Sequence, residues 1–343
     1  MFRSSIFAVV IFFLSISLLF GASGYVFLPD VEQGGCLIAV SSTGNGIVFD
    51  SGANQTTDED LMSFLNNLKS SGILKSLKFV VATHYDADHI GRLDKVLNSS
   101  LAGSDCIAYD RGTSGAPGTT AYSNYASAAS SHHRTTIKAN ATLDLGGGMT
   151  FHCLCVNCDL PNGTHASISG SDENNFSIAG ILSCGDFDLY YGGDLPKAME
   201  TKIVPFVKDI ELYVFDHHGS DGASGSDLLT ALKPEVGITQ MGKNSYGHPN
   251  KSAVTRFENI RSTSGGRPLM IQTNYGDEND SRVDNSLANY IADKSMTLTG
   301  IVTKGGTVAV HVADSEYEIS ALGIDPPVTL SCDGSQSLAM AAF

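Results

Sequence analysis

Short apolar runs alternate with polar and glycine-rich segments along the chain. Each run is rich in Val, Ile, Leu or Phe and is bounded by turn-forming residues, a pattern that predicts buried β-strands. The predicted strands cover residues 26–28, 36–40, 47–49, 79–83, 150–156, 176–184, 187–191, 212–215 and 236–240. These strands recur along the chain, so we expect a core built from sheets.

Helical periodicity falls between these strands, at residues 58–71, 227–232 and 285–294. Residues 297–312 predict a hairpin interrupted by two glycines, and the Ser-, Ala-, Gly- and Thr-rich residues 100–150 predict an elaborated surface region. The strands and helices alternate without a repeat or a linker. The pattern therefore predicts one α/β domain, with two sheets buried between helices.

The first 24 residues form a separate unit. Arg3 precedes an apolar run over 6–20, and small residues follow at 22–24. This order is typical of a secretory signal peptide. A membrane anchor is the alternative, although a spanning helix needs about 20 apolar residues. We expect a signal peptide at 1–24, a mature chain that begins at Tyr25, and a secreted, extracellular protein without stable membrane association after cleavage.

Cysteines and potential glycosylation sites agree with export. Seven cysteines lie in the mature chain, and in an oxidising compartment three bridges would leave one thiol. Cys184, inside an apolar run, is the candidate for that thiol. The spacing of Cys153, Cys155 and Cys158 could hold zinc, but no fourth ligand stands nearby, so disulfides are favoured there. Seven Asn-x-Ser/Thr triplets could accept sugars: Asn54, Asn98, Asn140, Asn162, Asn175, Asn250 and Asn279.

The chain is acidic, with 21 Lys and Arg against 36 Asp and Glu and a formal net charge of −15. This balance argues against a broad basic cleft that grips nucleic acid through its phosphates. It is compatible with a bound metal that supplies positive charge locally. Lys243 and Arg92 are candidate contacts to a nucleic acid, although a solvated surface role is favoured for each.

Acidic and imidazole side chains follow several predicted strands. His84, Asp86, Asp88 and His89 crowd into the stretch THYDADHIGRL, and such groups repel or titrate one another unless a cation lies between them. Further groups of this kind follow other strands: Asp50, Asp194, His217, His218 and His248. Because loops beyond strand ends gather into one site in layered α/β folds, the sequence predicts a metal site there.

This arrangement resembles the metallo-β-lactamase superfamily. The family motif H-x-H-x-D-H appears here as H-x-D-x-D-H, with Asp86 in place of the second histidine. Together with IVFDSG, ENNFSIAGIL, YYGGDL, DHHGSDGAS and QMGKNSYGHPN, the motif is similar to the extracellular hydrolase domain of ComEC-type competence proteins. The resemblance implies an αββα sandwich of two mixed sheets flanked by helices. It places a hydrolase domain at 25–320, followed by a C-terminal tail at 321–343.

The resemblance also implies two divalent metal ions. The implied ligands are His84 and Asp86 for the first ion, Asp88, His89 and His248 for the second, and Asp194 as the bridge between them. Asp86 makes the first site richer in oxygen, which shifts its preference from zinc toward manganese, although zinc also fits. A shared water would give a hydroxide source near neutral pH.

Other positions have supporting roles in this comparison. Asp50 would hold the metal loop by hydrogen bonding from outside the ligand set. The family's third-motif histidine is replaced by Glu173-Asn174, so either Asn174 or Glu173 is a weak ligand or the first site is loosely occupied. His217 or His218 would bind an anionic transition state. We favour His217 for that role and expect one of the two only to pack. The catalytic candidates are His217, Asp88 and His218.

The resulting hypothesis is a secreted, dinuclear metal-dependent hydrolase acting on phosphodiesters, with nuclease activity implied by the resemblance. One alternative is a hydrolase of the same fold that cleaves lactones, thioesters or other esters. Another is a secreted binding module whose incomplete metal site no longer supports turnover.

Overall fold

The computed structural model describes residues 22–54, 61–260, 269–274, 276, 279–283, 299–302, 307–313, 315–320 and 328–332. One sheet contains β1 (Ser23–Leu28), β2 (Cys36–Ser41), β3 (Asn45–Asp50), β4 (Ser76–Val81), β5 (Ile107–Asp110), β6 (Thr135–Thr136), β15 (Val308–Ala313), β16 (Glu316–Ser320) and β17 (Val328–Ser331). The other contains β7 (Thr142–Gly146), β8 (Met149–Cys155), β9 (Ala179–Cys184), β10 (Phe187–Tyr191), β11 (Leu212–Val214), β12 (Val236–Thr239), β13 (Leu269–Gln272) and β14 (Thr299–Val302).

The helices are short. The α-helices are α2 (Leu61–Ser70), α3 (Ala87–Ile90), α4 (Leu93–Leu97), α5 (Thr120–Ala129), α6 (Lys197–Ile203), α7 (Ser226–Leu232) and α8 (Lys251–Glu258). In the described part of the chain, three 3₁₀ segments accompany them: η2 (Glu173–Phe176), η3 (Val204–Phe206) and η4 (Asp216–Gly219). Among the described residues, no helix is both long enough and apolar enough to cross a membrane.

Both sheets mix parallel and antiparallel pairing. The strand order is β17-β16-β15-β1-β2-β3-β4-β5-β6 in the nine-stranded sheet and β14-β13-β12-β11-β10-β9-β8-β7 in the eight-stranded sheet. Pairing is parallel from β3 to β6 and from β10 to β14, and antiparallel elsewhere. Within each parallel region, the strands therefore end at the same edge of the sheet.

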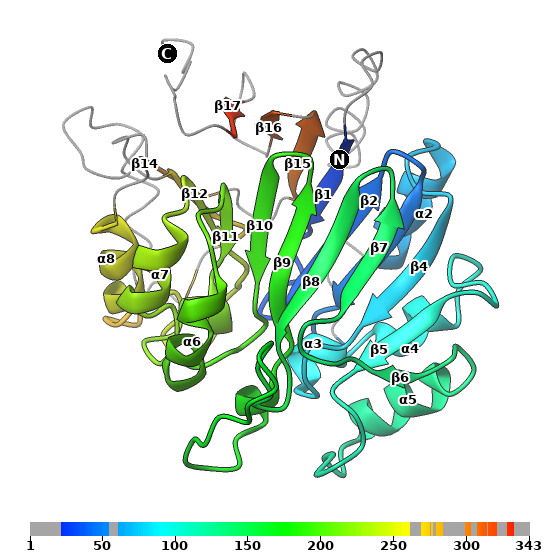
Figure 1. Cartoon of the computed structure of the whole chain (residues 1–343), viewed down its shortest axis with the longest axis horizontal. Coiled ribbons are helices and arrows are strands. Elements are labelled where there is room, and N and C mark those ends of the chain that lie inside the picture. Colours follow the sequence, from blue (N-terminus) through cyan, green and yellow to red (C-terminus); the bar gives the residue numbers. More distant parts are fainter. Residues whose placement is uncertain are drawn as a thin grey trace.

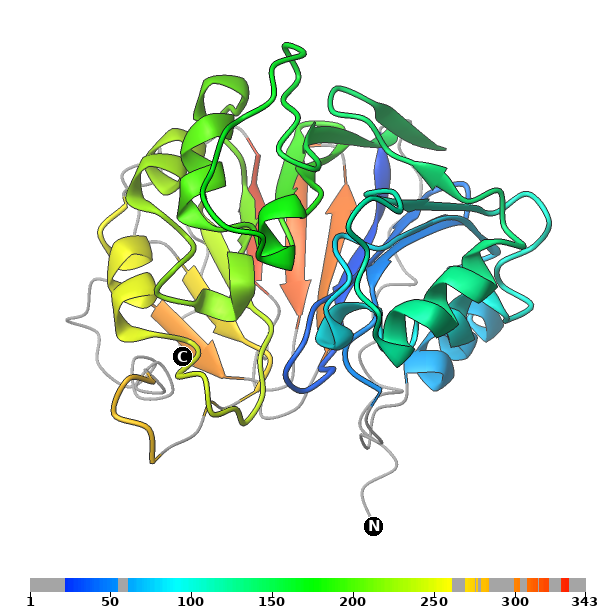
Figure 2. The ribbon, with the colours of Figure 1, turned by 90° about the horizontal axis from the view of Figure 1, so that it is seen from below.

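The layers follow the order helix, sheet, sheet, helix (Figures 1 and 2). Buried residues of α2, α4 and α5 pack on the outer face of the nine-stranded sheet. Those of α6, α7 and α8 pack on the outer face of the eight-stranded sheet. A third cluster fills the space between the sheets. This architecture confirms the expected αββα sandwich of two mixed sheets.

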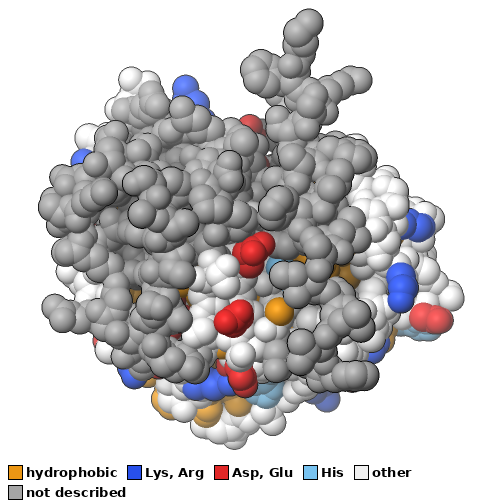
Figure 3. Space-filling model, turned by 90° about the horizontal axis from the view of Figure 1, so that it is seen from above, with side chains coloured by type: hydrophobic (Ala, Val, Ile, Leu, Met, Phe, Trp, Pro, Cys, Tyr) orange, Lys and Arg blue, Asp and Glu red, His pale blue; other side chains and the backbone are white. Residues whose placement is uncertain are grey.

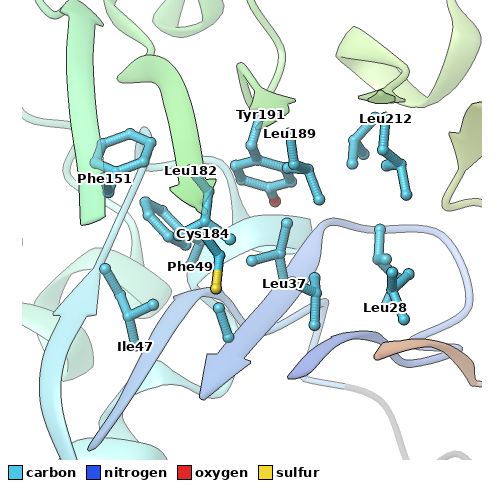
Figure 4. Packing of buried hydrophobic residues seen from close by; sticks show 14 of the residues in the cluster. Leu28, Leu37, Ile47, Phe49, Phe151, Leu182, Cys184, Leu189, Tyr191 and Leu212 are labelled. Atoms are coloured by element: carbon cyan, nitrogen blue, oxygen red, sulfur yellow. The ribbon is translucent and has the colours of Figure 1, made fainter. Parts of the chain in front are cut away.

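The central core explains why the strands are continuous apolar runs. Leu37 and Phe49 of the nine-stranded sheet face Leu182, Leu189 and Tyr191 of the other sheet (Figure 4). The alternate positions of the same strands are also buried, because helices cover the outer faces. A strand buried on both faces shows no alternation of polar and apolar residues.

Several segments differ from the sequence expectations. β14 and β15 do not form a hairpin, because β14 pairs in parallel with β13 while β15 pairs with β1 in the other sheet. The region 100–150 is not only surface: it contributes β5, α5, β6 and β7, and Tyr125 of α5 is fully buried. β17 lies inside the predicted C-terminal tail and pairs with β16. The helix expected at 285–294 lies outside the described residues.

The features linked to export need correction. Within the described residues, the seven cysteines are thiols and none forms the expected disulfides. They are divided among the three apolar clusters, with Cys36 and Cys106 under the helices of the nine-stranded sheet and Cys153 between the sheets. Cys184 lies in a buried strand, as expected.

The N-terminal and glycosylation expectations are tested only in part. Residues 1–21 of the expected signal peptide lie outside the described residues, while Ser23 and Gly24 already belong to β1. Asn175, one of the potential acceptor sites, is buried, so it cannot carry a sugar in this fold.

Candidate metal centre

The ends of five strands deliver the polar groups of this site. β3 ends at Asp50, and β4 leads into the loop that carries His84 and α3. β10 leads to Asp194, β11 leads to η4 with its two histidines, and β12 leads to the loop of His248. Because these strands belong to the two parallel regions, their carboxyl ends bring the side chains together between the sheets.

Five side chains converge most closely. His84, His89 and Asp194 form one group, and Asp88, His89 and His218 form another, with the ligand atoms of each group within 4.8 Å of one another. The His89 Nε2 atom lies 3.0 Å from Asp194 Oδ1 and 3.2 Å from His218 Nε2. His218 Nε2 is also 3.4 Å from Asp194 Oδ1 and 3.5 Å from Asp88 Oδ2.

Each of the three central imidazoles is oriented through its Nδ1 atom. The Nδ1–H of His89 donates to Asp50 Oδ2 at 2.8 Å, and that of His218 donates to the Gln240 carbonyl at 2.9 Å. His84 Nδ1 lies 3.0 Å from Thr83 Oγ1, whose own hydroxyl donates to Asp50. All three rings therefore present Nε2 to the centre, as metal-binding histidines do.

Asp50 supports the loop in the way the sequence indicated. It is completely buried and has a positive φ of 56°. Its Oδ1 accepts the backbone N–H of Thr83 at 2.8 Å, and its Oδ2 accepts hydrogen bonds from Thr83, His89 and Tyr191. One carboxylate thus joins the loop after β4, which carries His84 and is called the metal loop, to α3 and β10.

The electrostatics show how strongly the acidic and imidazole groups are coupled. Burial alone would raise the pKa of Asp194, but His89, His218 and His217 outweigh it and hold that pKa well below its ordinary value. Burial likewise disfavours the charged form of His89, yet Asp194 and Asp50 raise its pKa well above 6.5. The same balance, led by burial and reversed by Asp194, raises the pKa of His218.

This set of residues fits a divalent metal. His84 Nε2 and Asp194 Oδ1 are buried and make no hydrogen bond of good geometry, so each has a lone pair directed at the centre. Neutral imidazoles and carboxylates are the donors that zinc and manganese accept in proteins. The residues present therefore match the chemistry of a metal site.

Three expected ligands lie outside the two closest groups. The Asp86 side chain is 43% exposed and its Oδ2 is 3.7 Å from His84 Nε2. The ring of His248 is 5.3 Å from that of His217 and 6.2 Å from that of His218, and its buried Nδ1 has no hydrogen-bond partner. Asn174 is nearly buried on η2, with Oδ1 lacking a hydrogen-bond partner.

Two expectations are corrected at the edge of the site. Both carboxylate oxygens of Glu173 accept from Arg111, at 2.6 Å from Nε and 2.7 Å from Nη2, which was not expected of a metal ligand. Arg92, treated as a potential surface contact, is 3% exposed and therefore buried. Lys243 is exposed, as expected.

Both histidines of η4 face Asp194, whereas we expected one of them only to pack. His217 Nε2 is 3.6 Å from Asp194 Oδ2 and its side chain is 29% exposed, while His218 lies deeper, with 4% exposed. Both residues adopt left-handed backbone conformations, with φ of 52° and 55°. Two consecutive left-handed residues turn the chain so that both rings point to the same side.

Sequence reasoning missed three supporting residues. Thr83 orients His84, Tyr191 donates to Asp50, and the Gln240 carbonyl orients His218. Their only sequence signal is position, because each lies at or just beyond the end of a strand. A tyrosine or a backbone carbonyl at such a place has no motif of its own.

This chain shows limited similarity to known proteins. No protein-family model matches the sequence. A stretch of 87 residues is 30% identical to ComE operon protein 3 of Bacillus subtilis, covering 24% of this chain and 11% of that protein. The match therefore spans about a tenth of the relative's length.

Several solved structures are similar to parts of this chain. The metallo-β-lactamase fold protein YhfI from Bacillus subtilis has a TM-score of 0.44 and 11% identity, covering 69% of this chain and 93% of that one. Zn²⁺-bound PqqB from Methylobacterium extorquens has a TM-score of 0.43 and 12% identity, with coverages of 80% and 87%.

An isothiocyanate hydrolase from Delia radicum gut bacteria has a TM-score of 0.41 and 10% identity, with coverages of 82% and 97%. These TM-scores are all below 0.5, so the fold assignment rests on the sheet order and layers described above. Two of the similar structures are named as metallo-β-lactamase fold or superfamily proteins, and two are named as metal-dependent or Zn-dependent hydrolases.

Proposed function

We propose that this protein is a secreted hydrolase that uses two divalent cations, zinc or manganese, to cleave phosphodiesters. One observation carries the proposal. Three buried histidines are anchored through Nδ1, and their Nε2 atoms converge with Asp88 and Asp194. Export is supported by the basic start and apolar run of the first 24 residues.

The ligand set can be divided between the two ions. We assign His84 and Asp86 to one ion, Asp88 and His89 to the other, and Asp194 to a position between them. His248 stays a candidate on the second side. His218 joins the candidates there, because its Nε2 belongs to the same group as Asp88 and His89. Bound ions would supply Lewis acidity and a nucleophilic water near neutral pH.

His217 is placed to act on the substrate. It lies toward solvent and faces Asp194. Burial lowers the pKa of His217, and the charges of His218 and His89 add to this effect against the opposing charge of Asp194. A neutral imidazole at this place can donate its N–H to the negative charge that develops on a phosphoryl oxygen.

A phosphodiester fits the charge of the site better than a neutral ester does. A pair of cations can stabilise both the attacking and the leaving oxygen of an in-line displacement at phosphorus. The rest of the chain is acidic, so the ions would provide much of the attraction for an anionic substrate. The motif resemblance to ComEC-type hydrolase domains supports the same substrate class.

The test combines elemental analysis of the purified mature protein with activity on single-stranded DNA, a chromogenic phosphodiester, and a panel of lactones, thioesters and esters. We expect two equivalents of metal and turnover of the phosphodiesters. Asp194→Ala should lose metal from both sites and abolish hydrolysis. Asp159→Ala is the matched control, because Asp159 is a 58% exposed surface aspartate.

The other outcomes separate the alternatives. Turnover of lactones or esters alone would identify the other class of hydrolase. Bound metal without turnover of any substrate would indicate a binding module. An Asp194→Ala protein that keeps two metals and normal activity would show that the assigned site is wrong.

A further inference from the structure

Tyr246 is unusual because its ring faces water next to the metal centre. Among the described residues, it is the exposed large hydrophobic side chain, with 65% of its surface accessible. It lies in the loop 240–250, which joins β12 to α8 and also carries His248. An isolated exposed aromatic ring is not a broad apolar patch for a protein partner, but it suits a single flat ligand group.

The loop is held in place by Asn244, so the exposure of Tyr246 is built into the fold. Asn244 is buried, and its Oδ1 accepts the backbone N–H groups of Tyr246, Gly247 and His248 at 3.0, 3.0 and 3.2 Å. Its Nδ2 donates to the carbonyls of Gly242 and His248. One side chain therefore fixes the positions of Tyr246 and His248 relative to each other.

A series of rings connects Tyr246 with the centre. The Tyr246 and His248 rings are 5.9 Å apart, with 30° between their planes. His248 is in turn 5.3 Å from the ring of His217, whose Nε2 is 3.6 Å from Asp194. A planar group stacked on Tyr246 would thus be connected through the ring of His248 to His217, which faces Asp194.

The charged side chains of the loop itself are basic, while the acidic side chain of Glu32 lies beside Gly242. Residues 242–251 contain Lys243 and Lys251 and no acidic residue, although the chain has a net charge of −15. Both lysines are exposed. Arg282 Nη2 donates to the Ser245 carbonyl at 3.0 Å. The same guanidinium pairs with Asp280 at 2.6 Å, so the positive charge of Arg282 is offset there. The loop therefore combines a flat apolar ring with cations that suit a phosphate backbone.

We propose that Tyr246 is a stacking platform for a base of single-stranded nucleic acid whose phosphodiester is bound beside Asp194. This inference rests on the proposed function and narrows its substrate class. Stacking on an aromatic ring tolerates any base, because every base has a π-face. The site therefore takes single-stranded nucleic acid with little sequence preference, and Tyr246 contributes to binding rather than to the chemical step.

The experiment compares a single-stranded DNA oligomer with an abasic oligomer of equal length and charge. Binding is measured by fluorescence anisotropy, and hydrolysis by the KM and kcat of each oligomer, for the metal-loaded protein. Tyr246→Ala should weaken binding of the DNA oligomer about 5- to 150-fold, the range for one base stacked on one ring. Its binding of the abasic oligomer should change less than about twofold. The loss on DNA should appear in KM, with kcat maintained.

Two further variants isolate the ring. Tyr246→Phe keeps the π-face and should retain wild-type binding, while Tyr246→Leu keeps apolar volume without the ring and should behave like Tyr246→Ala. Equal losses on both oligomers, or no loss on either, would overturn the inference. If the wild-type protein shows Tyr246-dependent binding of DNA without cleaving it, the stacking site stands and the proposed hydrolysis fails. If it cleaves both oligomers equally and Tyr246→Ala changes nothing, only the stacking site fails.

Discussion

The histidines of the candidate metal centre depend on partners outside the candidate ligand set. Asp50 accepts hydrogen bonds from Thr83, His89 and Tyr191, so one buried carboxylate sets the tautomer of a ligand and the position of its loop. Such partners fix ring orientation and strengthen the donor nitrogen, and losing one typically weakens metal affinity about 10- to 100-fold. The geometry of the centre therefore depends on the residues that hydrogen-bond to the candidate ligands as well as on the ligands themselves.

The two histidines of η4 should separate metal binding from catalysis. His218→Ala removes an Nε2 that lies in a ligand group with Asp88 and His89, so we expect lower metal content and lower affinity for the remaining ion. His217→Ala removes a more exposed ring that faces Asp194 from the open side. It should keep the metal content and slow turnover by about 100-fold or more, the usual effect of losing a transition-state donor.

Elemental analysis and steady-state kinetics on the same preparations check this prediction. His165→Ala is the control, because His165 is 68% exposed and pairs only with the surface residue Asp159. If His217→Ala lost as much metal as His218→Ala, the two rings would share one role and the separation would be incorrect.

The 3₁₀ segment η2 contacts two loops of the nine-stranded sheet through Glu173, which is 15% exposed: Tyr85 in the loop after β4 and Arg111 after β5. Glu173 of η2 accepts the backbone N–H of Tyr85 at 3.0 Å and both Nε and Nη2 of Arg111. Arg111 is 1% exposed and its guanidinium lies 4.4 Å from the centre of the Tyr85 ring. Tyr85 stands between His84 and Asp86, so this pair positions the metal loop.

Breaking the pair should affect both stability and metal binding. Glu173→Gln leaves the buried Arg111 charge without its partner, which we expect to lower the free energy of unfolding by about 3–5 kcal/mol. Metal affinity should also fall, because the Tyr85 amide loses a charged acceptor. Urea unfolding and equilibrium dialysis measure the two effects.

The double variant Arg111→Met/Glu173→Met provides the control. It removes both charges. Its loss of stability should therefore be smaller than the sum of the losses measured for Arg111→Met alone and Glu173→Met alone. Additive losses would mean that the two side chains act independently.

The strands and the metal motif could be predicted because their signals are local. Ile47, Val48 and Phe49 form a short apolar run, and His84 to His89 form a dense motif directly after another run. The placement of β14 and β15 in different sheets could not be predicted, because it depends on pairing with strands that lie far away in the sequence or in the other sheet. For the same reason, the sequence did not reveal that Glu173 pairs with Arg111.

On the scale of the molecule, acidic groups are spread over the surface and also buried between elements. Figure 3 shows acidic side chains among mostly uncharged ones on the described part of one face, without a broad basic patch there. Glu211 and Glu235 are different, because burial is the main factor that raises the pKa of each to about 8. They lie next to β11 and β12, where Glu211 accepts the backbone N–H of Asp188 and Tyr317 donates to Glu235.

These two carboxyl groups should make the fold less stable in alkaline solution. The pKa of Glu211 in the folded chain, about 8, lies above its ordinary value of 4.5. Unfolding between these pH values therefore releases a proton, and the free energy of unfolding falls as the pH rises through this window and levels off above it. One such group contributes at most about 1.4 kcal/mol per pH unit.

Glu211→Gln removes the titrating carboxyl group, so no negative charge can form at this position at high pH. We expect the variant to match the wild type near pH 5 and to be more stable by about 1–3 kcal/mol near pH 9, since a glutamine oxygen can still accept the Asp188 N–H. Urea unfolding at a series of pH values, followed by circular dichroism, measures the difference. Glu316→Gln, at an exposed position of β16, should instead give a curve parallel to that of the wild type. A Glu211→Gln curve that also runs parallel would mean that Glu211 is ionised in the folded protein throughout this range.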